Sequence, residues 1–331
     1  MSGELLEISN LTLSLPVGEE LRTVLRAVDL SIGPGECVGL VGESGSGKSM
    51  TARSVIRTLP KGAQLGGRIE IGGTSVLDLA PRALRALRAR HVAMIFQEPL
   101  AHIDPVRTIG DHMTEALRLL GGRGRRDAWA ESEALLDAVK LEEPGRLMRH
   151  YPHELSGGML QRVMIAGALA VGPDLLLADE PTTALDVTTQ AEVAAILTDL
   201  QREHSLGVLF ISHDLELAAA ICDRIAVMYA GEIVEATPAG DLRVAPLHPY
   251  TAALLESRPS LVEDPSPLAV IPGQPIAAFE VGAGCPFAPR CGFRDDECTG
   301  SAPGRRTLDG GVVRCHHSEL MRARAVEEAR T

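Results

Sequence analysis

The sequence predicts an α/β fold around a mostly parallel sheet, and two observations carry that prediction. Short apolar runs of strand length recur along the chain, among them residues 36–42, 174–179 and 207–213. A longer segment with the apolar spacing of an amphipathic helix, residues 188–204, lies between two of these runs. Strands that alternate with helices in this way are typical of a parallel sheet covered by helices.

The remaining elements follow from the same periodicity. Residues 8–15 alternate apolar and polar side chains, as a half-buried strand does. Further strands are expected at residues 68–73 and 91–97, and further helices at residues 109–120, 128–140 and 157–170. These helices predict an inserted helical subdomain at about 99–171. Prolines and glycines become frequent after Leu242, so we expect a main domain at 1–243 and a small, irregular, cysteine-rich C-terminal extension at 244–331.

Length and charge limit the classes of function. The chain has 331 residues, enough for a well-buried main domain and a smaller part, and its net charge is −12. An acidic chain with only three lysines argues against nucleic acid as a partner. No apolar run approaches the roughly 20 residues that span a bilayer, and residues 1–10 do not resemble a signal peptide. We therefore expect a cytoplasmic protein, with reduced thiols.

Residues 42–49, GESGSGKS, fit the phosphate-binding pattern G-x-x-x-x-G-K-[ST]. The motif follows a predicted strand and precedes a predicted helix, which is the context that such a loop requires. Its backbone N–H groups and the helix N-terminus would surround the phosphates of a bound nucleotide. Lys48 would reach the β and γ phosphates, and the Ser49 hydroxyl would hold Mg²⁺. The expected nucleotide-binding residues of this loop are Gly42, Ser44, Gly45, Ser46, Gly47, Lys48, Ser49 and Met50.

Two further segments could act on the same nucleotide. Asp179 ends the apolar run LLLAD, where a carboxylate can meet Mg²⁺, and Glu180 could polarise an attacking water. Alone, such a pair is usually only a solvated strand end. Ser156 precedes a predicted helix and can cap it, while the N–H groups of Gly157 and Gly158 can form an anion site.

The order of GESGSGKS, FQEP, LSGGMLQR, LLLADEP, TALD and ISHD resembles the ATP-binding subunit of ABC transporters over roughly residues 4–243. The resemblance implies the P-loop ABC ATPase fold and several residue roles. It identifies Gln97 as the glutamine that senses the γ-phosphate and Mg²⁺, and His213 as the switch histidine. Ser156, Gly157 and Gly158 match the signature loop, which closes over ATP held by the opposite subunit. Asp186 matches the aspartate of the loop after the catalytic carboxylate.

Within that family, the chain resembles the peptide/nickel importer group. Met159 in the signature, together with HPYTAALLESRP, IPGQP and GCPFAPRC, carries this resemblance. It implies an ATP-hydrolysing translocase subunit that powers uptake of di- or oligopeptides; nickel or another metal chelate is the alternative cargo. The implied partners are two transmembrane permease subunits, a second ATP-binding subunit that is favoured to differ from this chain, and an extracytoplasmic solute-binding protein. The protein would be peripheral, at the cytoplasmic face of the membrane.

One departure from the family concerns adenine. The family usually stacks an aromatic ring on this base from a position before the phosphate loop, but no aromatic residue precedes Phe96 here. Leu21, Val24 or the Arg22 guanidinium are the candidates to substitute for that ring.

Four cysteines gather near the C-terminus: Cys285, Cys291, Cys298 and Cys315. In a reduced compartment this grouping suggests a metal site, and four thiolates suit Zn²⁺ or a [4Fe–4S] cluster. The intervals do not match the usual zinc-finger spacing. The resemblance to peptide-importer subunits implies the cluster, with zinc, free thiols and disulfides as alternatives. Cys37 and Cys222 are expected to be buried apolar residues, in a strand and a helix.

Two other functions compete with transport. A soluble ABC-type ATPase of DNA repair or translation would want a basic surface, tandem ATP domains or a coiled-coil insertion, and this acidic chain with one phosphate loop has none of these. The other alternative is that the extension is a redox or iron sensor that regulates transport, because ATP chemistry does not need its four grouped thiols.

Overall fold

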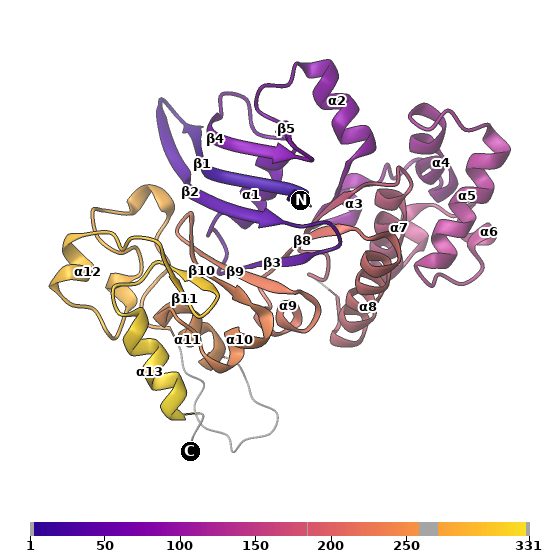
Figure 1. Cartoon of the computed structure of the whole chain (residues 1–331). Coiled ribbons are helices and arrows are strands. Elements are labelled where there is room, and N and C mark those ends of the chain that lie inside the picture. The colour runs from indigo at the N-terminus through magenta and orange to yellow at the C-terminus, as the bar shows by residue number, and fades with distance from the viewer. Residues whose placement is uncertain (1–2, 184, 258–270, 329–331) are drawn as a thin grey trace. The chain divides into compact units, whose positions relative to one another are not determined.

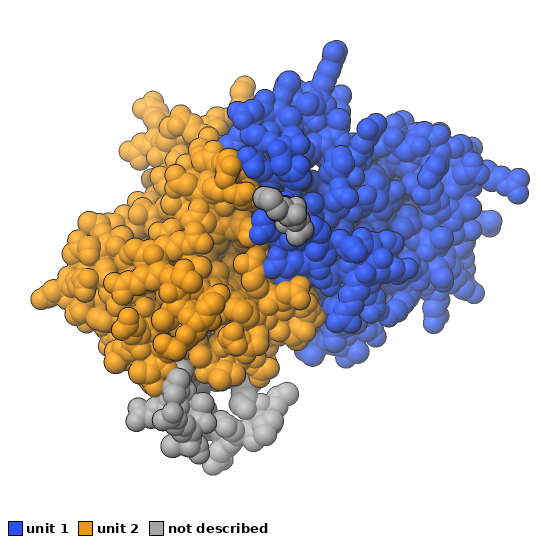
Figure 2. Space-filling view, in the orientation of Figure 1, with its two compact units in different colours: residues 1–6, 32–37, 70–212 blue, residues 7–31, 38–69, 213–331 orange. Residues whose placement is uncertain are grey.

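The computed structural model (Figure 1) describes residues 3–183, 185–257 and 271–328, and these group into two compact units (Figure 2). Unit 1 contains the described residues of 1–6, 32–37 and 70–212. Unit 2 contains those of 7–31, 38–69 and 213–331. None of the described helices combines the length and apolarity that crossing a bilayer requires.

The centre of unit 1 is a parallel sheet in the order β8-β7-β6. Its strands are β6 (Val92–Ile95), β7 (Leu175–Asp179) and β8 (Gly207–Ser212). Every residue of β7 and β8 is buried, which explains why both read as continuous apolar runs rather than alternating ones. The short strand β5 (Thr74–Ser75) pairs in this unit with the end of β4 (Gln64–Ile71).

The helical segment expected at about 99–171 contains α3 (Pro99–His102), α4 (Ile109–Leu119), α5 (Arg125–Ala138), α6 (Pro144–Leu147), η1 (Pro152–Glu154) and α7 (Gly157–Leu169). α4 starts where the Thr108 side chain accepts a hydrogen bond from the Asp111 N–H. α4 and α5 pack closely at Gly110: a Cβ at this position would lie only 2.8 Å from the Trp129 ring. Unit 1 also contains α2 (Pro81–Arg90) and α8 (Val187–His204).

Unit 2 contains two sheets. The first includes β2, β1 and β4 in that order, with β1 at Leu6–Val17 and β2 at Glu20–Ile32. The second has the order β11-β12-β10-β9-β3. Its strands are β3 (Cys37–Val41), β9 (Arg224–Tyr229), β10 (Glu232–Pro238), β11 (Arg306–Leu308) and β12 (Gly311–Val313). β3 runs parallel to β9, while β9, β10, β12 and β11 pair antiparallel.

The C-terminal extension therefore continues a sheet of unit 2. Its strand β12 pairs with β10 through Val313 and Glu235. Val313 and Cys315 form a small buried cluster with Leu247, against which Leu308 packs. The helices of this unit are α1 (Lys48–Val55), α9 (Leu215–Ile221), α10 (Ala239–Val244), α11 (Pro249–Glu256), η2 (Ala278–Glu280), η3 (Ala288–Arg290), α12 (Asp296–Gly300) and α13 (Ser318–Glu328).

Glu235 connects β10 to the start of α11. Its two carboxylate oxygens accept hydrogen bonds, each 2.9 Å long, from the backbone N–H groups of Leu247 and His248. The residue is fully buried, and this burial raises the pKa of Glu235 to about 7. The fold therefore favours the protonated carboxyl over its charged form.

We predict that Glu235 makes the protein less stable as pH rises. Its pKa in the fold lies above the ordinary value of 4.5, so its stabilising contribution is complete below that value and is lost as pH rises through about 7. The loss is on the order of 3 kcal/mol. In urea unfolding at pH 5 and pH 7.5, Glu235→Gln should show a smaller decrease in stability with pH than the wild type. The exposed Glu256→Gln is the control; an unchanged pH dependence in Glu235→Gln would contradict the prediction.

Candidate functional site

The phosphate-binding motif forms the connection between β3 and α1 in unit 2. Three of its glycines adopt positive φ: 153° at Gly42, 79° at Gly45 and 111° at Gly47. A Cβ at Gly42 would lie 2.1 Å from the Met228 carbonyl oxygen, and one at Gly47 would lie 2.8 Å from the Leu25 side chain. The loop thus needs glycine both for its backbone turn and for its close packing.

Lys48 is the first residue of α1 and is 4% exposed. Its ammonium group donates hydrogen bonds to the carbonyl oxygens of Gly42 (2.8 Å) and Glu43 (3.0 Å). The Lys48 ammonium group therefore bonds to the backbone of its own loop. Phosphates that bind there would replace these two carbonyl acceptors. Ser46 is buried and its hydroxyl has no hydrogen-bond partner among the described residues, which leaves a polar atom inside the loop that a ligand could satisfy.

Ser44 and Gly45 are exposed at the tip of the loop, while Ser49 and Met50 are half-buried in the first turn of α1. His213 is exposed and directly follows Ser212, which ends β8. It directly precedes Asp214, the residue that caps α9.

In unit 1, the strand-end carboxylates are where the sequence predicts them. Asp179 ends β7 and is 1% exposed. Glu180 follows with φ of 49°, a strained conformation for a residue with a side chain, and such strain is common at functional sites. Its Oε2 accepts hydrogen bonds from the Gln97 amide (3.0 Å) and the Thr183 hydroxyl (2.8 Å). Gln97 and Glu180 are thus in contact, although they are far apart in sequence.

The predicted signature loop forms the start of α7. Ser156 caps this helix, as its sequence position suggests, by accepting a hydrogen bond from the Met159 N–H. Gly157 and Gly158 are its first two residues.

Asp186 caps α8 in the same way, through the Thr189 N–H (3.0 Å) and hydroxyl (2.7 Å). These two bonds lower the pKa of Asp186. Ala184 of the TALD segment, and Arg258 and Pro259 of HPYTAALLESRP, lie outside the described residues.

The four grouped cysteines lie together in the extension of unit 2. The Cys285 N–H donates to the Cys298 carbonyl oxygen (2.8 Å). Cys291 and Cys315 each accept an N–H···S hydrogen bond, from Phe293 (3.4 Å) and His317 (3.3 Å). N–H donors directed at sulfur favour its thiolate form, so this arrangement suits thiolate ligands of a metal or cluster.

Burial raises the pKa of Cys285 to about 11 and that of Cys315 to about 12. The other three grouped cysteines contribute to the raised pKa of Cys315, which indicates that the four are neighbours. Without a metal these thiols are protonated at neutral pH, and a metal would displace their protons.

Among the described residues, one set of metal-ligating atoms lies close together, and it includes one of the four grouped cysteines. Ligand atoms of Asp295, Cys298 and His317 lie within 4.8 Å of one another. Zinc accepts mixed oxygen, sulfur and nitrogen ligands of this kind, so this set is compatible with the zinc alternative. The remaining cysteines, Cys37 and Cys222, are both buried as expected. The helix expected at Cys222 ends one residue earlier, at Ile221, because the chain turns into an extended conformation there.

Sequence reasoning missed three residues of unit 2 that contact the predicted ATP-binding elements. Arg290 and the Tyr250 hydroxyl both bond to Glu43 in the phosphate loop. The Arg22 guanidinium lies over the ring of Phe279, and its central carbon is 4.8 Å from the ring centre. All three come from beyond residue 243, and no local sequence signal indicates these contacts.

Comparison with known proteins gives two family matches. Residues 25–183 match the ABC transporter family, and residues 234–298 match the oligopeptide/dipeptide transporter C-terminal region. The chain is 42% identical over 311 residues to the oligopeptide transport ATP-binding protein OppD of Salmonella typhimurium, which covers 94% of this chain and 93% of that protein. It is 43% identical over 312 residues to a putative peptide import ATP-binding protein of Brucella abortus, covering 94% of each.

A solved structure supports the same assignment. The ATP-binding cassette MJ0796, in a dimeric post-hydrolysis state bound to ADP and Pi, is 30% identical with a TM-score of 0.64. The match covers 71% of this chain and 98% of that one. The chain belongs to the ABC transporter ATP-binding proteins, in the group that carries the oligopeptide/dipeptide transporter C-terminal region. Its fold is the P-loop ABC ATPase fold, as the sequence predicts.

We predict that two glycines of the loop differ in their tolerance to alanine. Gly42→Ala should destabilise the nucleotide-free protein by more than about 2 kcal/mol, because the new Cβ meets backbone that has no room to move. Gly45→Ala is the matched control: Gly45 also has positive φ, but no atom of the described chain lies within 4 Å of an added Cβ, so the substitution should cost about 1 kcal/mol. Urea unfolding measures both. Equal costs would show that crowding at Gly42 does not constrain the loop.

Proposed function

We propose that this chain binds and hydrolyses ATP to power the import of di- or oligopeptides through partner membrane subunits. The observation that carries the proposal is the loop between β3 and α1, whose glycines turn the backbone around Lys48. The relatives support the cargo class, since they are peptide transport ATP-binding proteins. Residues 1–243 would form the nucleotide-binding domain, with its helical subdomain at about 99–171, and residues 244–331 the extension.

Each site residue has a distinct role in this proposal. Lys48 and the loop N–H groups neutralise and orient the phosphates. Ser49 and Asp179 hold Mg²⁺, with Gln97 as a further contact that reports its presence. Glu180 polarises the attacking water, and His213 stabilises the γ-phosphate. Glu180 accepts hydrogen bonds from Gln97 and Thr183, so a nucleotide that engages Gln97 would remove one of these two bonds and make the carboxylate more available to the water.

The remaining ATP contacts come from a second subunit. We propose that Ser156, Gly157, Gly158 and Asp186 face ATP held by an opposing ATP-binding subunit, as the dimeric state of MJ0796 suggests. A related but different chain is favoured for that subunit. Because ATP would bind the closed pair more tightly than the open one, binding and hydrolysis can drive a conformational cycle.

The transport assembly would contain further proteins. Two transmembrane permease subunits would receive this motion, at the cytoplasmic face of the membrane. An extracytoplasmic solute-binding protein would deliver the peptide to those permeases.

For the extension we propose that Cys285, Cys291, Cys298 and Cys315 hold a [4Fe–4S] cluster. Four neighbouring thiols with N–H donors directed at two of them support this ligand set. Such a group, when bound, links loops by metal–sulfur bonds. The chain's own residues supply the ligands and a small apolar support from Leu247, Val313 and Leu308.

Glu180→Gln tests the catalytic assignment. Removing the carboxylate that polarises water should lower the ATP hydrolysis rate by about 100-fold or more. ATP binding should persist, because the phosphate loop is unchanged. The rate is measured by phosphate release from the assembled transporter, with Glu203→Gln on the exposed face of α8 as the control. Normal hydrolysis by Glu180→Gln would remove Glu180 from the mechanism.

Metal analysis of anaerobically purified protein tests the cluster. We expect about four irons and four acid-labile sulfides per chain, with broad absorption near about 400 nm. Cys315→Ser should lose them, whereas the buried Cys222→Ser should retain them. One zinc without sulfide would replace the cluster by a structural zinc site, and no metal would contradict both.

A further inference from the structure

Two residues of the C-terminal extension, Tyr250 and Arg290, contact Glu43 of the phosphate loop. The Arg290 guanidinium donates two hydrogen bonds to its carboxylate, of 2.6 Å and 3.1 Å. The Tyr250 hydroxyl accepts a hydrogen bond of 2.9 Å from the Glu43 N–H. Glu43 is the second residue of the GESGSGKS motif, so both contacts act on the loop itself.

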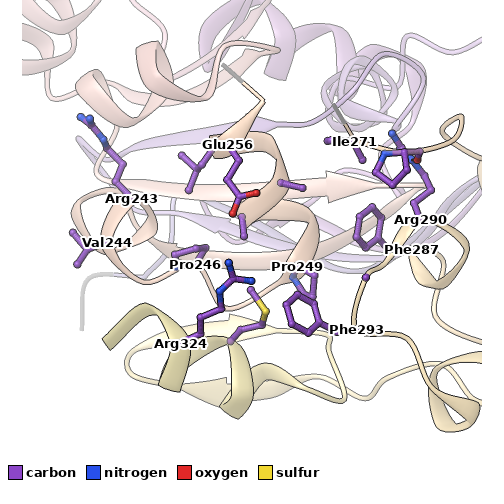
Figure 3. A pocket seen from close by; sticks show the side chains of 16 residues that line it. Arg243, Val244, Pro246, Pro249, Glu256, Ile271, Phe287, Arg290, Phe293 and Arg324 are labelled. Carbon is purple, nitrogen blue, oxygen red and sulfur yellow. The ribbon is translucent and has the colours of Figure 1, made fainter. Parts of the chain in front are cut away.

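Contacts other than its ion pair with Glu43 also fix the position of the Arg290 side chain. Its side chain is only 4% exposed, and its Nε donates to the Pro272 carbonyl oxygen (2.9 Å). The guanidinium also lies 5.8 Å from the Tyr229 ring centre and 5.9 Å from that of Phe287. Figure 3 shows Arg290 and Phe287 among the side chains that line a pocket of unit 2. A planar, two-point contact from a buried arginine restricts the carboxylate to one orientation.

The tyrosine contact is equally constrained. Tyr250 is buried at the start of α11, and its ring packs 4.7 Å from Tyr229 and 5.3 Å from Phe287, centre to centre. The Glu43 carbonyl oxygen accepts from Lys48, so the backbone of this residue is held from both sides. Any shift of Glu43 would therefore move the carbonyl that positions the phosphate-binding lysine.

The charge of Glu43 explains why the loop needs this support. A carboxylate within a phosphate-binding loop repels the phosphates of ATP unless a cation neutralises it. Arg290 supplies that cation. The hydrogen bonds with Glu43 also raise the pKa of Arg290 above its usual range, so the neutralising charge is permanent.

We propose that Arg290 and Tyr250 of the extension are positioning residues for ATP: they hold Glu43 so that its charge is masked and the phosphate loop is pre-formed. The extension would thereby set the affinity of the ATP site. Because Arg290 directly precedes Cys291, the loop that carries this contact is also the loop that carries a thiol of the four-cysteine group. The inference rests on the proposed ATP-binding function.

The test is a double-mutant cycle read as the Kd for Mg-ATP of the purified full-length chain. Arg290→Ala should weaken binding about tenfold, because it leaves the Glu43 carboxylate unmasked. Glu43→Gln with Arg290→Ala should bind at least threefold more tightly than Arg290→Ala alone, because no charge remains to be masked. If Arg290 served only to hold the fold together, the second substitution would give no recovery.

Tyr250→Phe and Arg290→Gln extend the test to milder changes. Both should raise Kd and KM for ATP more than they lower kcat, and their melting temperatures are measured without nucleotide to separate stability from affinity. Unchanged ATP affinity in all folded variants, or a double variant no tighter than Arg290→Ala, would overturn the inference. Failure of the wild type to bind ATP would instead reject the proposed function, so the two failures are distinguishable.

Discussion

The backbone turn between β3 and α1 is the constraint on which the proposed site depends. A loop that presents its N–H groups to phosphates must use conformations that residues with side chains rarely adopt, and glycines at 42, 45 and 47 meet that need. The turn also brings the Gly42 carbonyl to Lys48 and leaves no space for a Cβ beside Met228. Strand β9, which carries Met228, is thus part of the support of the loop.

The same loop is held by residues distant in sequence. Arg290 and Tyr250 fix Glu43, and their aromatic neighbours Tyr229 and Phe287 join β9 to the extension. The extension therefore has structural roles in addition to carrying the four grouped cysteines. It continues the sheet of unit 2 through β12 and supplies a cation to the phosphate loop.

Sequence predicted the parts of this protein that depend on local patterns. The phosphate loop, the cap at Ser156 and the buried strand that ends at Asp179 each need only a short stretch of chain, and the structure has all three. Strand β2 was not predicted, and a left-handed residue at Ala27 (φ 48°) interrupts its extended backbone. The pairing of β12 with β10 also escaped prediction, because three-residue strands leave too short a pattern.

Contacts between distant segments were beyond prediction for a different reason. The bond from Gln97 to Glu180, and the ion pair of Arg290 with Glu43, depend on tertiary packing rather than on periodicity. The family resemblance supplied the role of Gln97, and the position of Glu180 after an apolar strand suggested its role, but neither gave a reason to single out Arg290. Only the three-dimensional arrangement connects Arg290 and Tyr250 of the extension to Glu43 in the phosphate loop.

Equilibrium binding of Mg-ATP to the purified chain tests the central claim most directly. The account predicts saturable binding with one site per chain, a rise in melting temperature with ATP, and the loss of both in Lys48→Ala. Binding that is absent in the wild type, or that survives unchanged in Lys48→Ala, would contradict the assignment of this loop as the ATP site.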